Sequence, residues 1–426
     1  MESPAVSFTG VSTSRRAPRA GEQPPAWWRG LRAVVAGIGV LALAACAAQT
    51  GPKEPLARAT PSTQSASTTP TAPTRGPVPV ALLVPLGAAD DRAATSAVAI
   101  RNAAELALSG PAGTGLRIAT YDTLGTPEGA TNAANRALAD GARLILGPLF
   151  AANARAVGAV AGPSGVSVLS FSTDTEVAGG PVFVTGFAPE IEVARILEYA
   201  SRQGIRTIGV YAPNVPYGLA ALRGVEEAAG RSGVSVVAEE IYPRSFQDIE
   251  RTAPDFVARA QAAGAEAILL PDFGQGLAIA ASFVNFHGMP QPDVRYLGIG
   301  QWEAGETLRA PELAGGWFAG ADTIAVDTFA QRYATRYGSR PPFVAVLGYD
   351  AARIAAMLVA EARTVNSIAP FTRPALTRPG GFEGAIGNVR LRPDGTADRG
   401  LAILEVGPGR FVLREPAADR PAPADS

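Results

Sequence analysis

The chain is poor in the residues on which most covalent and metal chemistry depends. Its 426 residues include one cysteine, Cys46, and one histidine, His287. A lone cysteine cannot form an internal disulfide bond, and metal sites built from cysteine and histidine need several such ligands. We therefore expect no disulfide-bonded fold, no metal site and no cofactor.

Catalytic triads and dyads that use a histidine base would have to use His287. This residue lies between Phe286 and Gly288, with Pro290 two residues further on, which is typical of the end of a helix. A histidine at that place usually stabilises the helix C-terminus. Because no nucleophile and base can be paired, the sequence predicts a protein that is not an enzyme.

An excess of charge of either sign is also absent. The formal net charge is −1, so no bulk electrostatic attraction to nucleic acid or to an anionic membrane is expected. Hydrophobic residues make up 47% of the chain and charged residues 18%, which is ordinary for a globular protein. The length allows two or three average domains with a sizeable core.

The first 45 residues have the pattern of an export signal. A basic segment precedes an apolar run, residues 34–45, which is shorter than the roughly 20 residues that a membrane span needs. The run ends in Leu43-Ala44-Ala45-Cys46, which resembles the lipobox of bacterial lipoproteins. That resemblance implies removal of residues 1–45 and a lipid anchor on Cys46. The alternative is a buried helix that carries a cysteine by chance.

Two segments outside the apolar run lack the side chains for a core. Residues 46–76 are rich in Thr, Ser, Pro and Ala, and residues 414–426 are similar, so we expect a disordered tether and a disordered tail. Ala47 follows the cysteine where inner-membrane retention signals of this family carry Asp. We therefore expect a location on the periplasmic side of a bacterial membrane, with the outer membrane favoured.

From Val78 onward, apolar strand-like runs alternate with segments of helical spacing. This alternation predicts an α/β fold in which parallel sheets are flanked by helices, and two successive series predict two lobes. The predicted strands are 78–86, 116–121, 143–146, 167–171, 206–212, 234–241, 266–271 and 294–299. The predicted helices are 91–109, 127–140, 151–161, 217–230, 249–263 and 275–287.

The C-terminal third departs from this alternation. Two helices, 326–337 and 343–362, are predicted first. A hairpin is then predicted between residues 384–391 and 401–406, because Pro393-Asp394-Gly395 is a strong turn signal.

Ordered segments in this region resemble the type I periplasmic binding proteins of the leucine-binding branch, over residues 77–413. They include Ile145-Leu146-Gly147-Pro148, Val168-Leu169-Ser170-Phe171-Ser172, and Tyr211-Ala212-Pro213-Asn214-Val215-Pro216-Tyr217-Gly218. The resemblance implies two Rossmann-like lobes joined by three crossing strands. We place the crossings near Phe187, Asp322 and Gly395. Lobe 1 is then 77–186 plus 322–395, and lobe 2 is 187–321 plus 396–413.

In that family the ligand lies between the lobes. The matching positions here are Ala151, Ser170, Ser172, Thr173, Asp174, Tyr217, Phe273 and Gln301. The family's amino-acid receptors carry a serine where Ala151 stands and an acid near Gly300-Gln301, so two of their ligand contacts are missing. Asp174 stands where a Thr is usual. The serines, Thr173 and Asp174 are equally well explained as helix caps, and Tyr217 as a packed aromatic residue.

Two functions follow from the resemblance. One is a protein-binding role, because outer-membrane lipoproteins labelled penicillin-binding protein activators share segments such as Leu146–Ala154 and Val168–Asp174. We favour this reading, in which the partner is a peptidoglycan synthase. The alternative is a receptor that takes a small polar solute, of the branched-chain amino acid type, to an ABC permease.

Overall fold

The computed structural model describes residues 76–109 and 115–417. Cys46, the apolar run and nearly all of the predicted tether and tail lie outside these residues, so the predictions made for them stay predictions. The described residues all belong to one compact unit. In the part of the chain that the structure describes, no helix has the length and apolarity needed to cross a membrane.

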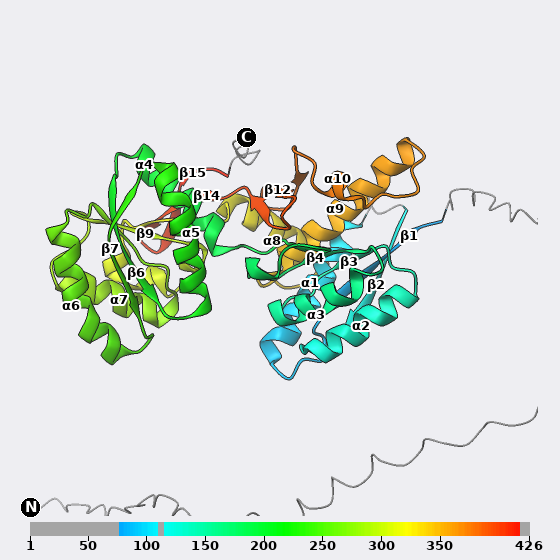
Figure 1. Cartoon of the computed structure of the whole chain (residues 1–426), viewed down its shortest axis with the longest axis horizontal. Coiled ribbons are helices and arrows are strands. Elements are labelled where there is room, and N and C mark those ends of the chain that lie inside the picture. Colours follow the sequence, from blue (N-terminus) through cyan, green and yellow to red (C-terminus); the bar gives the residue numbers. More distant parts are fainter. Residues whose placement is uncertain (1–75, 110–114, 418–426) are drawn as a thin grey trace, which may run out of the picture. The chain divides into compact units, whose positions relative to one another are not determined.

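Lobe 1 is built on a parallel five-stranded sheet with the order β2-β1-β3-β4-β5 (Figure 1). Its side chains alternate between two helical layers, as expected of strands buried on both faces. Val80 and Leu82 face one layer, and Ala81 and Leu83 the other. The strands are β1 (Val78–Val84), β2 (Leu116–Asp122), β3 (Leu144–Leu146), β4 (Ser167–Ser170) and β5 (Val182–Val184).

The two layers of lobe 1 come from distant parts of the chain. The first layer holds α1 (Asp91–Ala107), α8 (Thr323–Tyr337) and α9 (Ala345–Thr364), and the second holds α2 (Pro127–Ala139) and α3 (Ala151–Ala161). The buried face of α2 consists of glycine and alanine residues, which allow a close approach to the sheet. A short 3₁₀ helix, η3 (Thr175–Val177), follows β4.

Lobe 2 has a seven-stranded sheet with the order β15-β14-β10-β9-β8-β6-β7. Five strands are parallel, and β14 and β15 add an antiparallel edge. Its strands are β6 (Thr207–Pro213), β7 (Ser235–Tyr242), β8 (Ala267–Leu269), β9 (Arg295–Gly298), β10 (Trp317–Gly320), β14 (Ala402–Gly407) and β15 (Arg410–Glu415). Its helices are α4 (Pro189–Arg202), α5 (Pro216–Ser232), α6 (Phe246–Ala262), α7 (Gly274–Phe286), η4 (Gly300–Trp302), η5 (Thr307–Arg309) and η6 (Pro311–Leu313).

A small antiparallel sheet corrects the predicted C-terminal hairpin. Its strands are β11 (Phe382–Glu383), β12 (Asn388–Leu391) and β13 (Ala397–Arg399), and it follows the short helix α10 (Arg373–Leu376). The Pro393-Asp394-Gly395 turn joins β12 to β13, whereas residues 402–407 pair with β10 in the other lobe. The predicted pairing of 384–391 with 401–406 was therefore wrong, although the turn itself was right.

The same finding moves the third crossing. Gly395 lies inside lobe 1, in the turn between β12 and β13. Its carbonyl oxygen accepts a hydrogen bond from Val184 N at 2.7 Å. A Cβ at Gly395, which has φ of +94°, would lie 2.4 Å from Gly179 N. The chain leaves lobe 1 after β13, at residues 400–401. The chain also passes between the two large sheets at 185–188 and at 321–322.

The predicted helices and parallel strands are found, with ends that differ by a few residues. His287 is the C-cap residue of α7, as predicted. Several elements of the described residues have no counterpart in the prediction, and three of them are β5, α4 and β10. The last two lie in lobe 2 next to a crossing, and α4 carries a buried acid of the candidate site.

Candidate functional site

The residues predicted to line the ligand cleft lie just past the carboxyl ends of the parallel strands. Ala151 follows β3, the segment 170–174 ends and follows β4, Tyr217 follows β6, Phe273 follows β8, and Gln301 follows β9. Open α/β sheets bind their ligands at this edge. The eight residues therefore lie at one edge of each sheet. They follow two strands in lobe 1 and three strands in lobe 2.

The lobe 1 part of the site is centred on the start of α3. Ala151 is the first residue of this helix, and its N-cap residue, Phe150, supplies no side-chain acceptor. The first backbone N–H groups of α3 are thus open to an outside acceptor. In the same turn, Nδ2 of Asn153 is buried without a hydrogen-bond partner in the described part of the chain.

The loop after β4 is held together by its own side chains. Ser170 is fully buried, donates to Pro148 O at 3.1 Å and accepts from Ser172 N at 3.2 Å. Ser172 Oγ accepts from Asp174 N at 3.0 Å, and Asp174 Oδ1 accepts from Glu176 N, which caps η3. Of these residues, Thr173 is exposed and Asp174 half-buried.

Asp174 is thus the N-cap residue of η3, as the capping interpretation expects. The hydroxyls of Ser170 and Ser172 instead form hydrogen bonds within the loop and with Pro148 of lobe 1. On its surface, this loop presents Thr173 and the second carboxylate oxygen of Asp174.

The lobe 2 part of the site carries an aromatic pair. The rings of Tyr217, in the first turn of α5, and Phe273, the N-cap residue of α7, meet edge to face with centroids 5.8 Å apart. The guanidinium of Arg244 lies 4.0 Å from the centre of the Phe273 ring. Arg244 Nε also donates to Asp272 Oδ1 at 2.7 Å, and Asp272 is fully buried. Neither Arg244 nor Asp272 was predicted.

A buried acid, Glu192, joins this aromatic pair to the loop after β9. Glu192 Oε2 accepts from Gly300 N at 3.1 Å and from the Tyr217 hydroxyl at 3.4 Å. The same hydroxyl accepts from Gln301 N at 3.2 Å. Glu192 is 4% exposed, and burial raises its pKa to about 8, although these hydrogen bonds oppose the rise. Burial also raises the pKa of nearby Glu303, to about 7.

The family's amino-acid receptors carry an acid near Gly300-Gln301, which this sequence lacks, and Glu192 contacts that segment instead. An acid is present against that loop, but it comes from α4, more than a hundred residues earlier in the chain. A Cβ on Gly300 would lie 2.2 Å from Glu192 Oε1, so glycine at 300 makes room for it. The sequence offered no signal for this contact, because α4 itself was not predicted.

Helix starts at the carboxyl ends of the strands are of two kinds, with and without a side-chain cap. A side-chain oxygen caps α1 (Asp90), α2 (Thr126), α6 (Ser245) and α8 (Asp322). The three helices that follow the central strands β3, β6 and β8 instead have apolar N-cap residues and no side-chain cap; these are Phe150, Val215 and Phe273. Helices α4 and α9 also lack such a cap. Uncapped helix starts bind anionic groups.

A search of residues 76–109 and 115–417 finds no group of three or more His, Cys, Asp or Glu side chains that could hold a metal ion. The groups that the site offers are backbone N–H groups at uncapped helix starts, an aromatic pair, the guanidinium of Arg244 and the buried acids Asp272 and Glu192. This set suits the recognition of a small polar molecule.

Comparison with known proteins gives one family. A family model described as periplasmic binding protein matches residues 77–410. No curated protein matches the chain.

Solved structures of similar fold share little sequence with the chain. A putative branched-chain amino acid ABC transporter protein from Rhodospirillum rubrum is 22% identical with a TM-score of 0.67, covering 79% of this chain and 99% of that one. An ABC transporter substrate-binding protein from Sphaerobacter thermophilus is 18% identical (TM-score 0.64; 81% and 99%). A branched-chain amino acid ABC transporter periplasmic ligand-binding protein from Burkholderia xenovorans is 17% identical (TM-score 0.63; 80% and 96%). At these identities the likeness concerns the fold alone.

Proposed function

Because the chain belongs to the periplasmic binding protein family, whose members are ligand-binding receptors and not enzymes, we propose that it binds a small organic anion and passes it to an ABC transporter. The observation that carries this proposal is the set of uncapped starts of α3, α5 and α7, which come from both lobes. Their partial positive charge favours a carboxylate or a similar group. The ABC transporter names of the solved neighbours support the second half of the proposal.

The aromatic pair defines the rest of the proposed ligand. Tyr217 and Phe273 offer ring edges and faces to an apolar body, and Arg244 stands beside Phe273. The serine hydroxyl of the family's amino-acid receptors is absent at Ala151, and Glu192 already has two hydrogen-bond donors. We therefore propose a carboxylate with an apolar body, and not one of the branched-chain amino acids.

The test compares acids with their own amides by thermal shift of the purified protein. The pairs are benzoate with benzamide and leucine with leucinamide. A ligand at about 100 times its Kd stabilises the folded state by about 2.7 kcal/mol, which raises Tm by several degrees. We expect a shift with benzoate and none with benzamide, leucine or leucinamide. Equal shifts with both members of a pair contradict the anion requirement, and a large shift with leucine contradicts the exclusion of amino acids.

A second function is supported by the two missing amino-acid contacts, at Ala151 and at Gln301. We keep as a candidate the activation of a peptidoglycan synthase through protein contact. A pull-down of such a synthase with the purified protein tests it, with Tyr217→Ala as the matched variant. If the synthase is captured equally by both proteins and no carboxylate raises Tm, the activator role replaces the receptor role.

The membrane location is part of the proposal and depends on Cys46 alone. We propose that residues 1–45 are removed, that Cys46 is lipidated on the periplasmic side, with the outer membrane favoured, and that residues 46–76 serve as a tether. Mass spectrometry of the protein from membranes should find a diacylglycerol on Cys46. Cys46→Ser should release the protein from the membrane, and retention of this variant contradicts the anchor.

A further inference from the structure

Three hydrogen bonds meet at a fully buried acid, Asp272, next to the aromatic pair of the candidate site. Its carboxylate accepts from the Tyr242 hydroxyl, from Arg244 Nε and from Phe273 N, each at 2.7 Å. Tyr242 is the last residue of β7, and Asp272 and Phe273 lie between β8 and α7. Because a buried acceptor is costly to leave unsatisfied, three donors hold this carboxylate firmly. Asp272 therefore joins the carboxyl ends of two strands at the ligand edge.

Arg244 holds Phe273 at two points. Its Nη2 donates to Phe273 O, and its Cζ lies 4.0 Å from the centre of the Phe273 ring. Such a contact between a cation and a ring is stronger when the cation is partly removed from water, and the Arg244 side chain is 28% exposed. A Cβ at residue 276 would lie 2.8 Å from Arg244 Nε, so Gly276 leaves the room that the guanidinium occupies. Backbone and ring of Phe273 are thus fixed by one side chain.

The two rings of the aromatic pair are held by separate sets of hydrogen bonds. The Phe273 ring depends on Arg244 and Asp272, and it meets the Tyr217 ring edge to face, with centroids 5.8 Å apart. The Tyr217 hydroxyl is held by Gln301 N at 3.2 Å and by Glu192 at 3.4 Å. Rings that are ordered before a ligand arrives lose little further freedom when it binds, so they favour ligands that fit their orientation.

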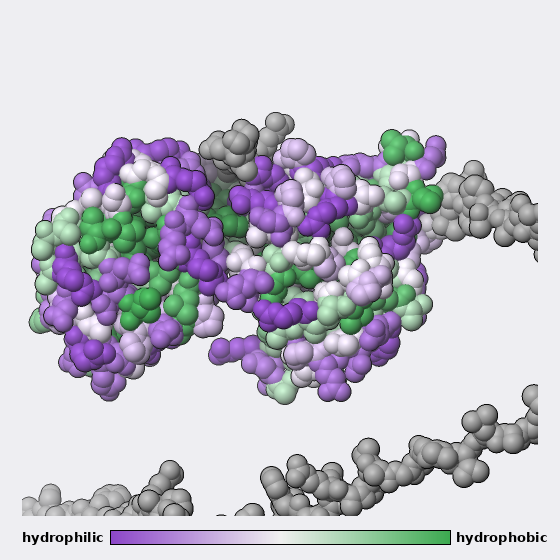
Figure 2. Space-filling model, in the orientation of Figure 1, coloured by the Kyte–Doolittle hydropathy of each residue, from purple (hydrophilic) through white to green (hydrophobic). Residues whose placement is uncertain are grey.

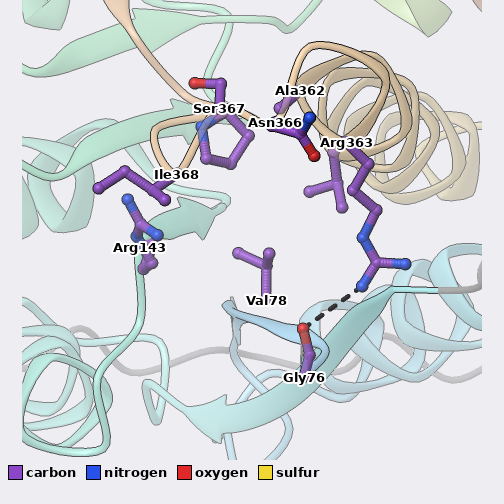
Figure 3. A pocket seen from close by; sticks show the side chains of 10 residues that line it. Gly76, Val78, Arg143, Ala362, Arg363, Asn366, Ser367 and Ile368 are labelled. Atoms are coloured by element: carbon purple, nitrogen blue, oxygen red, sulfur yellow. Dashed lines mark hydrogen bonds between the residues drawn. The ribbon is translucent and has the colours of Figure 1, made fainter. Parts of the chain in front are cut away.

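A cavity of lobe 1 lacks this feature. It has a volume of about 390 Å³ and lies at the amino ends of the strands, beside Val78 and Arg143 (Figure 3). None of the described residues that line it is aromatic. The face of lobe 2 seen in Figure 2 mixes hydrophilic and hydrophobic residues, so hydrophobicity alone does not mark the ligand edge. The ligand edge of lobe 2 is distinguished by the fixed rings of Tyr217 and Phe273.

We propose that Arg244 is a positioning residue for the Phe273 ring, and that the ring it fixes makes the site prefer flat aromatic acids to saturated acids of equal size and charge. This inference rests on the proposed function, a carboxylate with an apolar body, and names that body. Contacts between aromatic rings are worth about a two- to tenfold gain in affinity beyond the buried area, and they depend on ring orientation. A saturated ring gains no such contact.

The test compares the Kd values of benzoate and cyclohexanecarboxylate, which have the same number of carbons and one carboxylate each. Benzoate should bind about two- to tenfold more tightly. Arg244→Lys keeps a cation beside Asp272 but loses the planar group and the second arm that reaches Phe273 O, so the ratio of the two Kd values should fall to about 1. A purely structural loss would weaken both acids by the same factor and leave this ratio unchanged.

Three further variants separate positioning from direct contact. Phe273→Leu removes the ring, and Arg244→Lys combined with Phe273→Leu should have the same ratio as Phe273→Leu alone, because Arg244 acts through that ring. Arg244→Gln with Asp272→Asn removes the pair without leaving an unpaired charge, and it should match Arg244→Lys. The control is Arg251→Lys, at an arginine of α6 whose side chain is 66% exposed, and it should keep the parent ratio.

The outcomes distinguish this inference from the proposed function. Equal Kd values for the two acids in the unchanged protein overturn the inference and leave a carboxylate receptor. An unchanged ratio in both Arg244 variants also overturns it. So does a further change of the ratio in the double variant with Phe273→Leu, because Arg244 would then contact the ligand itself. If neither acid binds, the proposed function fails and this inference fails with it.

Discussion

Asp350 in lobe 1 and Glu192 in lobe 2 are buried carboxylates near crossings, and the two are held differently. Asp350 in lobe 1 is 2% exposed, accepts from Arg399 Nη1 at 2.9 Å and accepts from Ala385 N at 2.7 Å. Glu192 in lobe 2 is 4% exposed. Among the described residues, none of its hydrogen-bond partners is a basic side chain. Burial raises the pKa of both acids, but only for Asp350 does an arginine oppose the rise.

Asp350 therefore has a structural role, whereas Glu192 is an acid that can gain or lose a proton. Arg399 also donates to Thr185 O at 2.8 Å, so the Asp350 pair ties the first crossing segment to the third. Glu192, in contrast, connects side chains of the candidate site and is protonated at neutral pH because its pKa is about 8. Lobe 1 therefore holds its buried acid in an ion pair, whereas the buried acid of lobe 2 has no such counter-charge among the described residues.

The largest expected effect is on the pH dependence of stability. The folded state holds a proton on Glu192 up to a pKa of about 8, whereas the unfolded state loses it near 4.5. The folded state thus binds more protons between these values, and the free energy of unfolding should fall as pH rises through this window, by up to about 5 kcal/mol. Glu192→Gln, which cannot ionise, should show a smaller fall, and the part that remains is due to Glu303, whose pKa burial raises to about 7. Parallel urea titrations at pH 5 and pH 8 measure the difference, and identical falls in both proteins contradict it.

Removing Asp350 should lower the free energy of unfolding by slightly less than the pH effect expected for Glu192. Asp350→Ala leaves Arg399 buried without its counter-charge, and breaking a buried pair in this way costs about 3–5 kcal/mol. Asp350→Asn keeps an acceptor for Ala385 N and should lose less. Urea denaturation at pH 7 checks both variants. A loss below about 1 kcal/mol for Asp350→Ala would mean that water reaches Arg399.

The Tyr217 hydroxyl should matter through its two hydrogen bonds. Tyr217→Phe leaves Gln301 N and Glu192 without this partner, which should cost about 1–3 kcal/mol. Because the ring stays, its edge-to-face contact with Phe273 should persist. The pH dependence should change as well, since the hydroxyl helps to hold Glu192. A variant as stable as the parent protein at both pH 5 and pH 8 would show that Glu192 and Tyr217 are not coupled.

The smallest expected effect tests the self-contained loop of lobe 1. Ser172→Ala removes the acceptor for Asp174 N and should cost about 0.5–1.5 kcal/mol. Thr173→Ala, on the exposed neighbour, is the control and should change stability by less than about 0.5 kcal/mol. Neither variant should alter the pH dependence. If Thr173→Ala is the more destabilising of the two, the loop is not held as the hydrogen bonds indicate.

Local sequence patterns were enough for most of the fold. The apolar run that begins at Val78 and the run 143–146 marked strands whose side chains are buried, and hydrophobic spacing marked the helices between them. His287 was recognised as a helix end because Gly288 follows it. These features depend on residues that are close in the sequence. A continuous apolar run predicts a buried strand wherever that strand lies in the sheet.

The errors concern partners that are distant in the sequence. The Pro393-Asp394-Gly395 turn was recognised, but the strand it leads to was not, because pairing of β13 with β12 and of β14 with β10 depends on which sheet is within reach. In the same way, Ser170 and Ser172 were placed correctly at the strand end, yet their direction into lobe 1 follows from the packing of Pro148 and Asp174 around them.

The sequence by itself determined the two-lobed α/β architecture, the edge at which the candidate site lies and the absence of a histidine- or cysteine-based catalytic centre. Tertiary structure decided which groups meet there. Glu192 contacts Gly300 across more than a hundred residues, and its raised pKa arises from burial that no local pattern reveals. Protonation and hydrogen bonding are properties of an environment, and folding brings that environment together from separate parts of the chain.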